Sequence, residues 1–197
     1  MAIGSPDKAG RLDQLRTFAR CQVWSGYRTD AEVRAEVYDA ARAEERDPAR
    51  AQALTDAVLA AARQDLLEAS RVWPASTPYD RLQSAFAELR GRDVVVLEAV
   101  DDHWAAHERL AEDRAGGRPP RGIAYFTHPD VWHAVEHGML ELNVWHGTTA
   151  NVAPGDELLD LLLRVLHEHG IAAVFDEGRI EATVAWQRRP PVAAASR

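Results

Sequence analysis

The stretch Trp73-Pro-Ala-Ser-Thr-Pro78 divides the chain into two parts with different sequence patterns. Its two prolines disfavour helix on either side, because each restricts the preceding residue to extended conformations. Before this stretch the apolar spacing is helical throughout, and after it helical and strand-like segments alternate. We therefore expect a helical N-terminal region over residues 1–75 and an α+β domain over residues 76–187.

The N-terminal region is expected to contain three amphipathic helices. Leu15 and Ala19 fall on one face of the first. Thr29-Asp-Ala-Glu32 has the capping-box pattern at the start of the second. Asp47-Pro48 starts the third, which runs to about Ser70, with an N-cap residue and a proline at the first helical position. Short helices joined by brief turns predict a three-helix bundle.

The second part is expected to alternate helix and strand. Val94-Val-Val-Leu97 is uninterrupted and β-branched, which predicts a strand buried on both faces. The other expected elements are helices starting at Thr77, Asp101, Thr127 and Asp156, strands at 123–126 and 140–145, and a hairpin of 171–175 and 180–186 around Gly178. This order predicts a mixed sheet of about five strands with helices mainly on one face. Residues 188–197 read as a flexible tail.

Composition and charge exclude several classes of function. The 197 residues carry 23 Lys+Arg and 31 Asp+Glu, a formal net charge of −8. Residues 1–75 have a net charge of −1 and residues 76–197 one of −7, so we expect no nucleic-acid partner. The apolar runs are far too short to span a bilayer, so no membrane association is expected. A single cysteine, Cys21, excludes an intrachain disulfide. We expect a cytoplasmic protein.

Part of the sequence resembles a known family. The matching residues are Thr77-x-x-Asp80-Arg81-Leu82-x-x-Ala85-Phe86-x-x-Leu89, then Gly122-x-x-Tyr125-Phe126-x-x-x-Asp130-x-x-x-Ala134-Val135-Glu136-x-Gly138-x-Leu140-x-Leu142, and finally Trp186-Gln-Arg-Arg189. Over roughly residues 73–187 the chain resembles an uncharacterised bacterial family known only as a domain of unknown function. The Trp24-Ser-Gly-Tyr27 region is similar to the helical part that often precedes it.

That resemblance implies a fold and no activity. Members of the family often carry a cysteine cluster after the first strand. Here the segment is Leu97-Glu-Ala-Val-Asp-Asp102, without cysteine. No metal or redox role of that cluster transfers to this chain.

All eight histidines lie between residues 103 and 169. His103 and His107 are spaced i, i+4 on an expected helix, as are His133 and His137, which places each pair on one helix face, as a metal site requires. His133-Ala-Val-Glu136-His137 also matches the His-x-x-Glu-His pattern of inverted zincins, in which Glu is the general base. These four histidines are the metal-ligand candidates, and a metal-dependent hydrolase using His133, Glu136 and His137 is the alternative function.

Several observations argue against a metal-dependent hydrolase. An inverted zincin needs a third ligand on a later helix, whereas the residues after His137 read as parts of the same sheet. A histidine in the last turn of a helix is also explained by the helix dipole. The sequence has no Gly-x-Ser-x-Gly elbow and no phosphate-binding glycine loop. We assign no catalytic residue and expect no cofactor.

The tryptophans leave two roles open. Aromatic side chains at the ends of strands and helices line pockets or interfaces, or pack in cores. This applies to Trp24, Trp73, Trp104, Trp132 and Trp145. The sequence favours a non-enzymatic binding or regulatory module over an enzyme. Its partner would be a protein or a small molecule, and the oligomeric state stays open.

Overall fold

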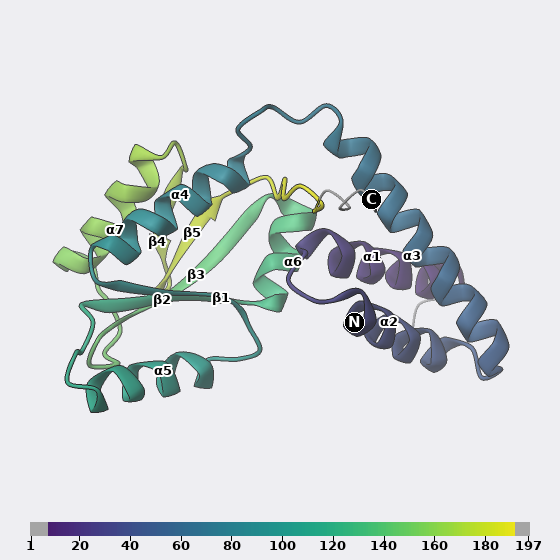
Figure 1. The fold of residues 1–197 in the computed structure, drawn as a ribbon, viewed down its shortest axis with the longest axis horizontal. Coiled ribbons are helices and arrows are strands. Elements are labelled where there is room, and N and C mark those ends of the chain that lie inside the picture. The colour runs from purple at the N-terminus through teal and green to yellow at the C-terminus, as the bar shows by residue number, and fades with distance from the viewer. Residues whose placement is uncertain (1–7, 192–197) are drawn as a thin grey trace, which may run out of the picture. The chain divides into compact units, whose positions relative to one another are not determined.

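The computed structural model describes residues 8–191 and divides them into two compact units (Figure 1). The helical unit is the described part of Met1–Trp73 together with that of Arg188–Arg197. The α+β unit is Pro74–Gln187. None of the helices in the described chain has the length and apolar character needed to cross a membrane.

The helical unit consists of α1 (Lys8–Ser25), α2 (Asp30–Glu44) and α3 (Pro48–Ser70). The expected capping box of α2 is confirmed: Thr29 Oγ1 accepts from the Glu32 backbone N–H, and Glu32 accepts from the Thr29 backbone N–H. At α3 the Asp47 carboxylate accepts from the amides of Ala49 and Arg50. Each such cap contributes about 1 kcal/mol by satisfying amides that the first helical turn leaves open.

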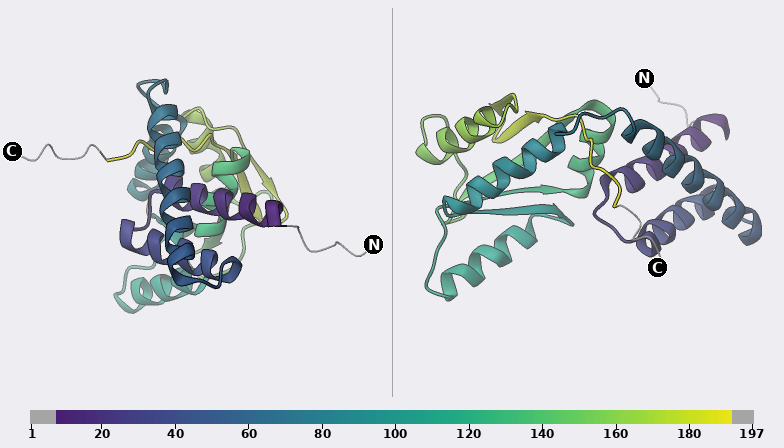
Figure 2. Two further views of the ribbon diagram at one scale, coloured as in Figure 1. Left: turned by 90° about the vertical axis from the view of Figure 1, so that its right-hand side faces the viewer. Right: turned by 45° about the horizontal axis from the view of Figure 1, so that its top comes forward.

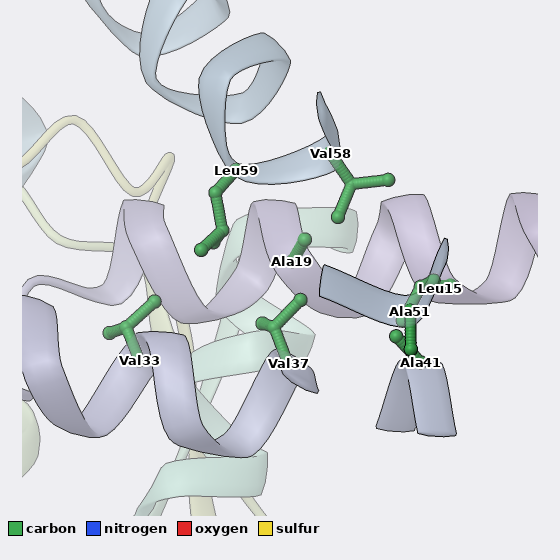
Figure 3. Close-up of a cluster of buried hydrophobic side chains, with 8 residues drawn as sticks. All are labelled: Leu15, Ala19, Val33, Val37, Ala41, Ala51, Val58 and Leu59. Carbon is green, nitrogen blue, oxygen red and sulfur yellow. The ribbon is translucent and has the colours of Figure 1, made fainter. Parts of the chain in front are cut away.

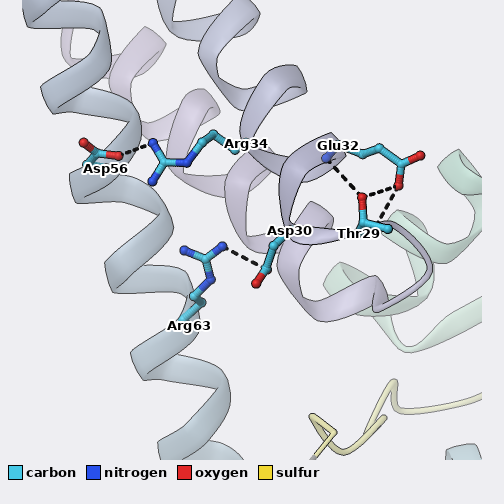
Figure 4. A network of polar contacts seen from close by, with 6 residues as sticks. All are labelled: Thr29, Asp30, Glu32, Arg34, Asp56 and Arg63. Atoms are coloured by element: carbon cyan, nitrogen blue, oxygen red, sulfur yellow. Dashed lines mark hydrogen bonds and ion pairs between the residues drawn. The ribbon is translucent and has the colours of Figure 1, made fainter. Parts of the chain in front are cut away.

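One apolar cluster joins the three helices (Figure 3). Its buried members include both small and branched side chains, and the small ones let the helices approach closely. They are Leu15 and Ala19 of α1, Val33, Val37 and Ala41 of α2, and Ala51, Val58 and Leu59 of α3. Two ion pairs, Arg34–Asp56 at 2.5 Å and Arg63–Asp30 at 3.0 Å, join α2 to α3 at the surface (Figure 4).

The α+β unit alternates helices and strands, and the α+β fold class is confirmed. Its elements are α4 (Pro78–Gly91), β1 (Val94–Val100), α5 (Trp104–Ala115), β2 (Gly122–Thr127), α6 (His128–His137), β3 (Met139–His146), α7 (Glu157–Glu168), β4 (Ala173–Asp176) and β5 (Arg179–Thr183). Capping boxes at Thr77 and Thr127 start α4 and α6, as their sequences predict. Gly138 ends α6 in the left-handed conformation, with φ +72°.

The five strands form one mixed sheet in the order β1-β2-β3-β5-β4. Only β1 and β2 are parallel, which requires the crossover through α5. Helices α4 and α7 contact each other and cover one sheet face (Figure 2). On this face Phe86 of α4 stacks on Phe126 of β2. Alternation along the strands places Leu140, Leu142 and Val144 on this same face, all fully buried.

One helix of the α+β unit covers part of the opposite sheet face. Helix α5 packs there, through Ala106 and Leu110, on Ile123 and Tyr125 of β2. Helices therefore cover parts of both faces of the sheet. The first strand is also an edge strand, in which buried Val94 and Val96 alternate with half-buried residues, rather than a strand buried on both faces.

The end of the chain differs as well. The sequence predicts a flexible tail from Arg188 on, whereas the guanidinium groups of Arg188 and Arg189 donate hydrogen bonds to backbone carbonyls of the helical unit. Residues 188–191, hereafter the C-terminal segment, thus belong to that unit. Residues 192–197 of the expected tail lie outside the described residues.

Candidate functional site

The predicted histidine pairs both form, each on its own helix. The ring centroids of His133 and His137 on α6 are 4.7 Å apart, and those of His103 and His107 are 6.0 Å apart. Glu136 lies exposed beside His137. Among the described residues, however, no three or more His, Cys, Asp or Glu side chains come together in a group that could hold a metal ion.

The pair His103 and His107 belongs to a group of aromatic rings instead. His107 lies against Trp145 of β3, with centroids 4.6 Å apart, and Trp145 contacts Tyr125 edge-on at 4.9 Å. The ring centroid of exposed Trp104 lies 5.5 Å from that of His107. Burial raises the pKa of Tyr125 to about 12, so its phenol stays neutral at physiological pH. This arrangement packs α5 onto the sheet.

Other histidines of the α+β unit bond to carboxylates of that unit. His169 Nε2 lies 2.9 Å from Glu88, and His146 Nε2 lies 2.9 Å from Asp156, the N-cap of α7. The hydrogen bond from His169 and then that from Arg92 lower the pKa of Glu88. His146 first, and the Ala153 amide second, lower the pKa of Asp156. These contacts join elements to one another and need no ligand to explain them.

A pocket of about 620 Å³ lies in the helical unit, away from the histidine pairs that the sequence offers as metal ligands. Its walls are the end of α1, the start of α2, the second half of α3 and the C-terminal segment. This volume is in the range of sites that hold small organic ligands. Every residue that lines the pocket belongs to the helical unit.

The C-terminal segment forms one wall because its arginines hold it against the helices. Arg188 donates to the Ser25 carbonyl at 3.2 Å, and its guanidinium stacks over the Tyr27 ring at 4.3 Å. Arg189 donates to the carbonyls of Ser70 and Trp73. Ser25 and Ser70 are the last residues of α1 and α3, where backbone carbonyls lack helical partners, and Trp73 lies just past the end of α3.

Gly26 permits this close approach. Its φ of +70° is a left-handed conformation that ends α1, and a Cβ at this position would lie 3.0 Å from the side chain of Arg188. A residue other than glycine would therefore strain the backbone and displace the arginine. The turn at Trp24-Ser-Gly-Tyr27 is thus shaped to receive the C-terminal segment.

Positive charge predominates around the pocket. Four arginines line it, Arg28, Arg63, Arg188 and Arg189, against a single carboxylate, Asp30. The Asp30 side chain is 92% exposed and pairs with Arg63 at 3.0 Å (Figure 4). Arg28 pairs with Glu36, which is outside the lining, at 2.8 Å. The remaining wall is largely apolar, with Val33, Leu66, Leu67 and the two prolines of the C-terminal segment.

The most informative lining residue is Gln22. Its side chain is 1% exposed, and within the described chain neither its amide nitrogen nor its amide oxygen has a hydrogen-bond partner. Trp24 also lines the pocket, and its indole N–H is similarly buried and unpartnered among the described residues. Buried polar groups in native proteins are almost always bonded. A residue that lines a pocket and carries such unsatisfied groups is a candidate to bond a ligand.

Sequence reasoning missed most of these residues. It left open whether Trp24 lines a pocket or packs in the core, and the structure gives it a place in the pocket wall. Gln22 lies within α1, and no sequence pattern distinguishes it from its neighbours. Arg188 and Arg189 fall in the stretch for which the sequence predicts a flexible tail. The one available signal was the Arg-Arg-Pro-Pro run after the last strand, since two prolines fix an extended backbone.

Comparisons with known proteins identify a family and no function. A family model described as a domain of unknown function, DUF6891, matches residues 8–190, nearly the whole described chain. The match includes both the helical unit and the α+β unit, and it extends through Arg188 and Arg189. No curated protein and no solved structure matches this chain.

Proposed function

We propose that this chain, which belongs to the DUF6891 family of domains of unknown function, is a non-enzymatic module. It binds a small molecule in the pocket of the helical unit. The observation that carries this proposal is that Gln22, whose buried side-chain amide has no partner among the described residues, is one of the residues that line the pocket. Leaving such a group unsatisfied costs about 1–3 kcal/mol, which a hydrogen-bonding ligand recovers.

The chemistry of the pocket supports binding rather than catalysis. Among the described residues that line it there is no histidine, cysteine, serine, lysine or glutamate. The Thr29 hydroxyl accepts from the amide of Glu32 in the capping box. The Asp30 carboxylate pairs with Arg63. A nucleophile needs an adjacent base that is itself oriented by a third group, and these residues do not form such a set.

The alternative, a metal-dependent hydrolase using His133, Glu136 and His137, has no comparable supporting observation. A catalytic zinc needs three protein ligands and an open position. A thermal melt in excess EDTA, beside one with added zinc, tests this alternative. A large drop in melting temperature in EDTA that is absent in His133→Ala would favour it over the binding module.

We also propose a cytoplasmic location. The chain has a single cysteine, Cys21, and its side chain is buried in α1. Proteins of oxidising compartments commonly carry paired cysteines, so this composition supports a reducing one.

A ligand-observed NMR screen of the full chain tests the binding function. The fragment panel should contain neutral, anionic and cationic compounds, and hits should be measured again with Gln22→Leu. We expect this variant to fold at least as well as the wild type, because it removes an unsatisfied polar group, and to lose binding. Gln14→Leu is the matched control, since Gln14 is an exposed residue of the same helix. Absence of hits in every class, or equal binding by Gln22→Leu, would refute the proposal.

A further inference from the structure

We infer that the ligand of this pocket is a small organic anion, with a carboxylate or phosphate head and an apolar body. This inference rests on the proposed binding function and adds the chemical class of the ligand. It is carried by the four arginines around the pocket, the exposed carboxylate of Asp30 and the unpartnered Gln22 amide.

The charge of the pocket contrasts with that of the whole chain. The chain has a net charge of −8, whereas the pocket lining has four arginines and one aspartate. The surrounding unit is also basic: Met1–Trp73 with Arg188–Arg197 contains 14 basic and 12 acidic residues, a net charge of +2. A cationic pocket within a cationic unit attracts anions and repels cations.

Arginine suits an oxyanion better than lysine does, because its planar guanidinium matches a carboxylate or phosphate with two parallel hydrogen bonds. Lys8 is the single lysine of the chain, whereas the four cationic residues that line the pocket are all arginines. Arg188 is held in place by Ser25 and by the ring of Tyr27. A charge already fixed in position loses little conformational entropy when a ligand binds.

Asp30 occupies the position that a ligand head would take. Its carboxylate bonds to Arg63 at 3.0 Å, and 92% of its side chain is exposed. A surface ion pair of this kind contributes little to stability. An incoming carboxylate or phosphate can therefore displace it at small cost, while Asp30 turns to solvent. Asp30 thus competes with an anionic ligand for Arg63.

The apolar part of the lining requires a ligand body as well as a head. Val33, Leu66 and Leu67 lie on the helical side, and Leu67 is 49% exposed despite its size. Pro190 and Pro191 face them from the C-terminal segment. An inorganic ion would leave this surface uncovered, whereas an aliphatic or aromatic body would bury it and gain free energy in proportion to the area covered.

Four probes with a common body separate these contributions: 4-phenylbutanoate, 4-phenylbutyl phosphate, 4-phenylbutanamide and 4-phenylbutylamine. Binding to the full chain is measured by saturation-transfer NMR and by the fluorescence of the tryptophans. We expect both anions to bind about tenfold or more tightly than the amide, and the amine not to bind. The two anions distinguish a carboxylate site from a phosphate site.

Three variants test the assignment of residues. Arg63→Gln should weaken anion binding about tenfold or more, and Asp30→Asn should strengthen it because the competing carboxylate is gone. Arg50→Gln is the control, since Arg50 is exposed and outside the pocket. The Asp30→Asn result does not depend on a loss of function, so a folding defect cannot produce the expected gain.

The outcomes separate this inference from the proposed function. Equal binding of the amide and the carboxylate, or no gain with Asp30→Asn, overturns the anionic ligand and leaves the binding module intact. The same holds if none of the four probes binds while a fragment from the wider screen binds through Gln22. If no compound in either experiment binds, both proposals fail.

Discussion

The two units of this protein differ in net charge and in the bonding of their polar side chains. The α+β unit contains 9 basic and 19 acidic residues, a net charge of −10, and all eight histidines, whereas the helical unit has a net charge of +2. In the α+β unit, His146 and His169 bond to carboxylates of the same unit. In the helical unit, four arginines surround a pocket with a buried, unpartnered glutamine. The histidines, which suggest metal binding or catalysis, are thus all in the α+β unit. The pocket, and the Gln22 that lines it, are in the helical unit.

The largest expected effect comes from removing the pocket wall that the C-terminal segment contributes to the helical unit. A chain that ends at Gln187 lacks Arg188 and Arg189, and with them the bonds to Ser25, Ser70 and Trp73. We expect complete loss of pocket binding, and faster amide hydrogen exchange at Trp24–Asp30. Exchange in the strands of the α+β unit should not change. Binding that survives the truncation would show that the C-terminal segment is not part of the site.

A second prediction concerns a close backbone approach in the α+β unit. A Cβ on Gly147 would lie 2.0 Å from the Pro120 carbonyl oxygen, and a backbone atom cannot move aside as a side chain can. We expect Gly147→Ala to lower the free energy of unfolding by about 1–3 kcal/mol, measured by denaturant titration. Gly91→Ala is the matched control, because no atom lies within 4 Å of its Cβ position. It should be neutral or slightly stabilising in the last turn of α4. Equal losses from both substitutions would contradict the proposed clash.

Local signals in the sequence predicted much of the fold. Thr29, Asp47 and Thr77 each bond to amides within three residues, so their roles follow from short sequence patterns. The placement of α5 on the second sheet face could not be predicted in this way. Its stripe of Ala106 and Leu110 specifies a buried side and leaves the choice of sheet face open.

The pocket could not be predicted from the sequence for a similar reason. The bond from Arg188 to Ser25 spans 163 residues, and no local pattern encodes a contact of that range. The histidine pairs were the opposite case. Their i, i+4 spacing correctly predicted that His133 and His137 lie together, yet a metal site also needs ligands from other elements. Spacing on one helix cannot supply them.

A third prediction sharpens the assignment of the hairpin between β4 and β5. Both central residues of the turn have positive φ, Glu177 at +43° and Gly178 at +92°, which is the pattern of a type I′ turn. Gly178→Val should cost about 1–2 kcal/mol, because a β-branched residue is penalised in this conformation. Glu177→Asn should raise the melting temperature slightly, since asparagine tolerates positive φ better than glutamate. A loss of stability with Glu177→Asn would show that the glutamate side chain has a role the turn geometry does not explain.

The smallest expected effect tests whether the histidine–carboxylate pairs of the α+β unit are structural. Hydrogen bonds from His169 and Arg92 hold the pKa of Glu88 below its ordinary value of 4.5, so its ionised form is favoured by folding. The resulting stabilisation is fully present above that ordinary value and is lost as the pH falls through the lowered pKa of the folded state. We expect Glu88→Gln to melt a little below the wild type at pH 6, and this difference to shrink as the pH falls below about 4.5. Glu108→Gln, at an exposed residue of α5, is the matched control for the same substitution. A gap for Glu88→Gln that stays constant down to pH 3 would mean that Glu88 acts through packing rather than charge, and the contrast between the two units would then lose its electrostatic basis.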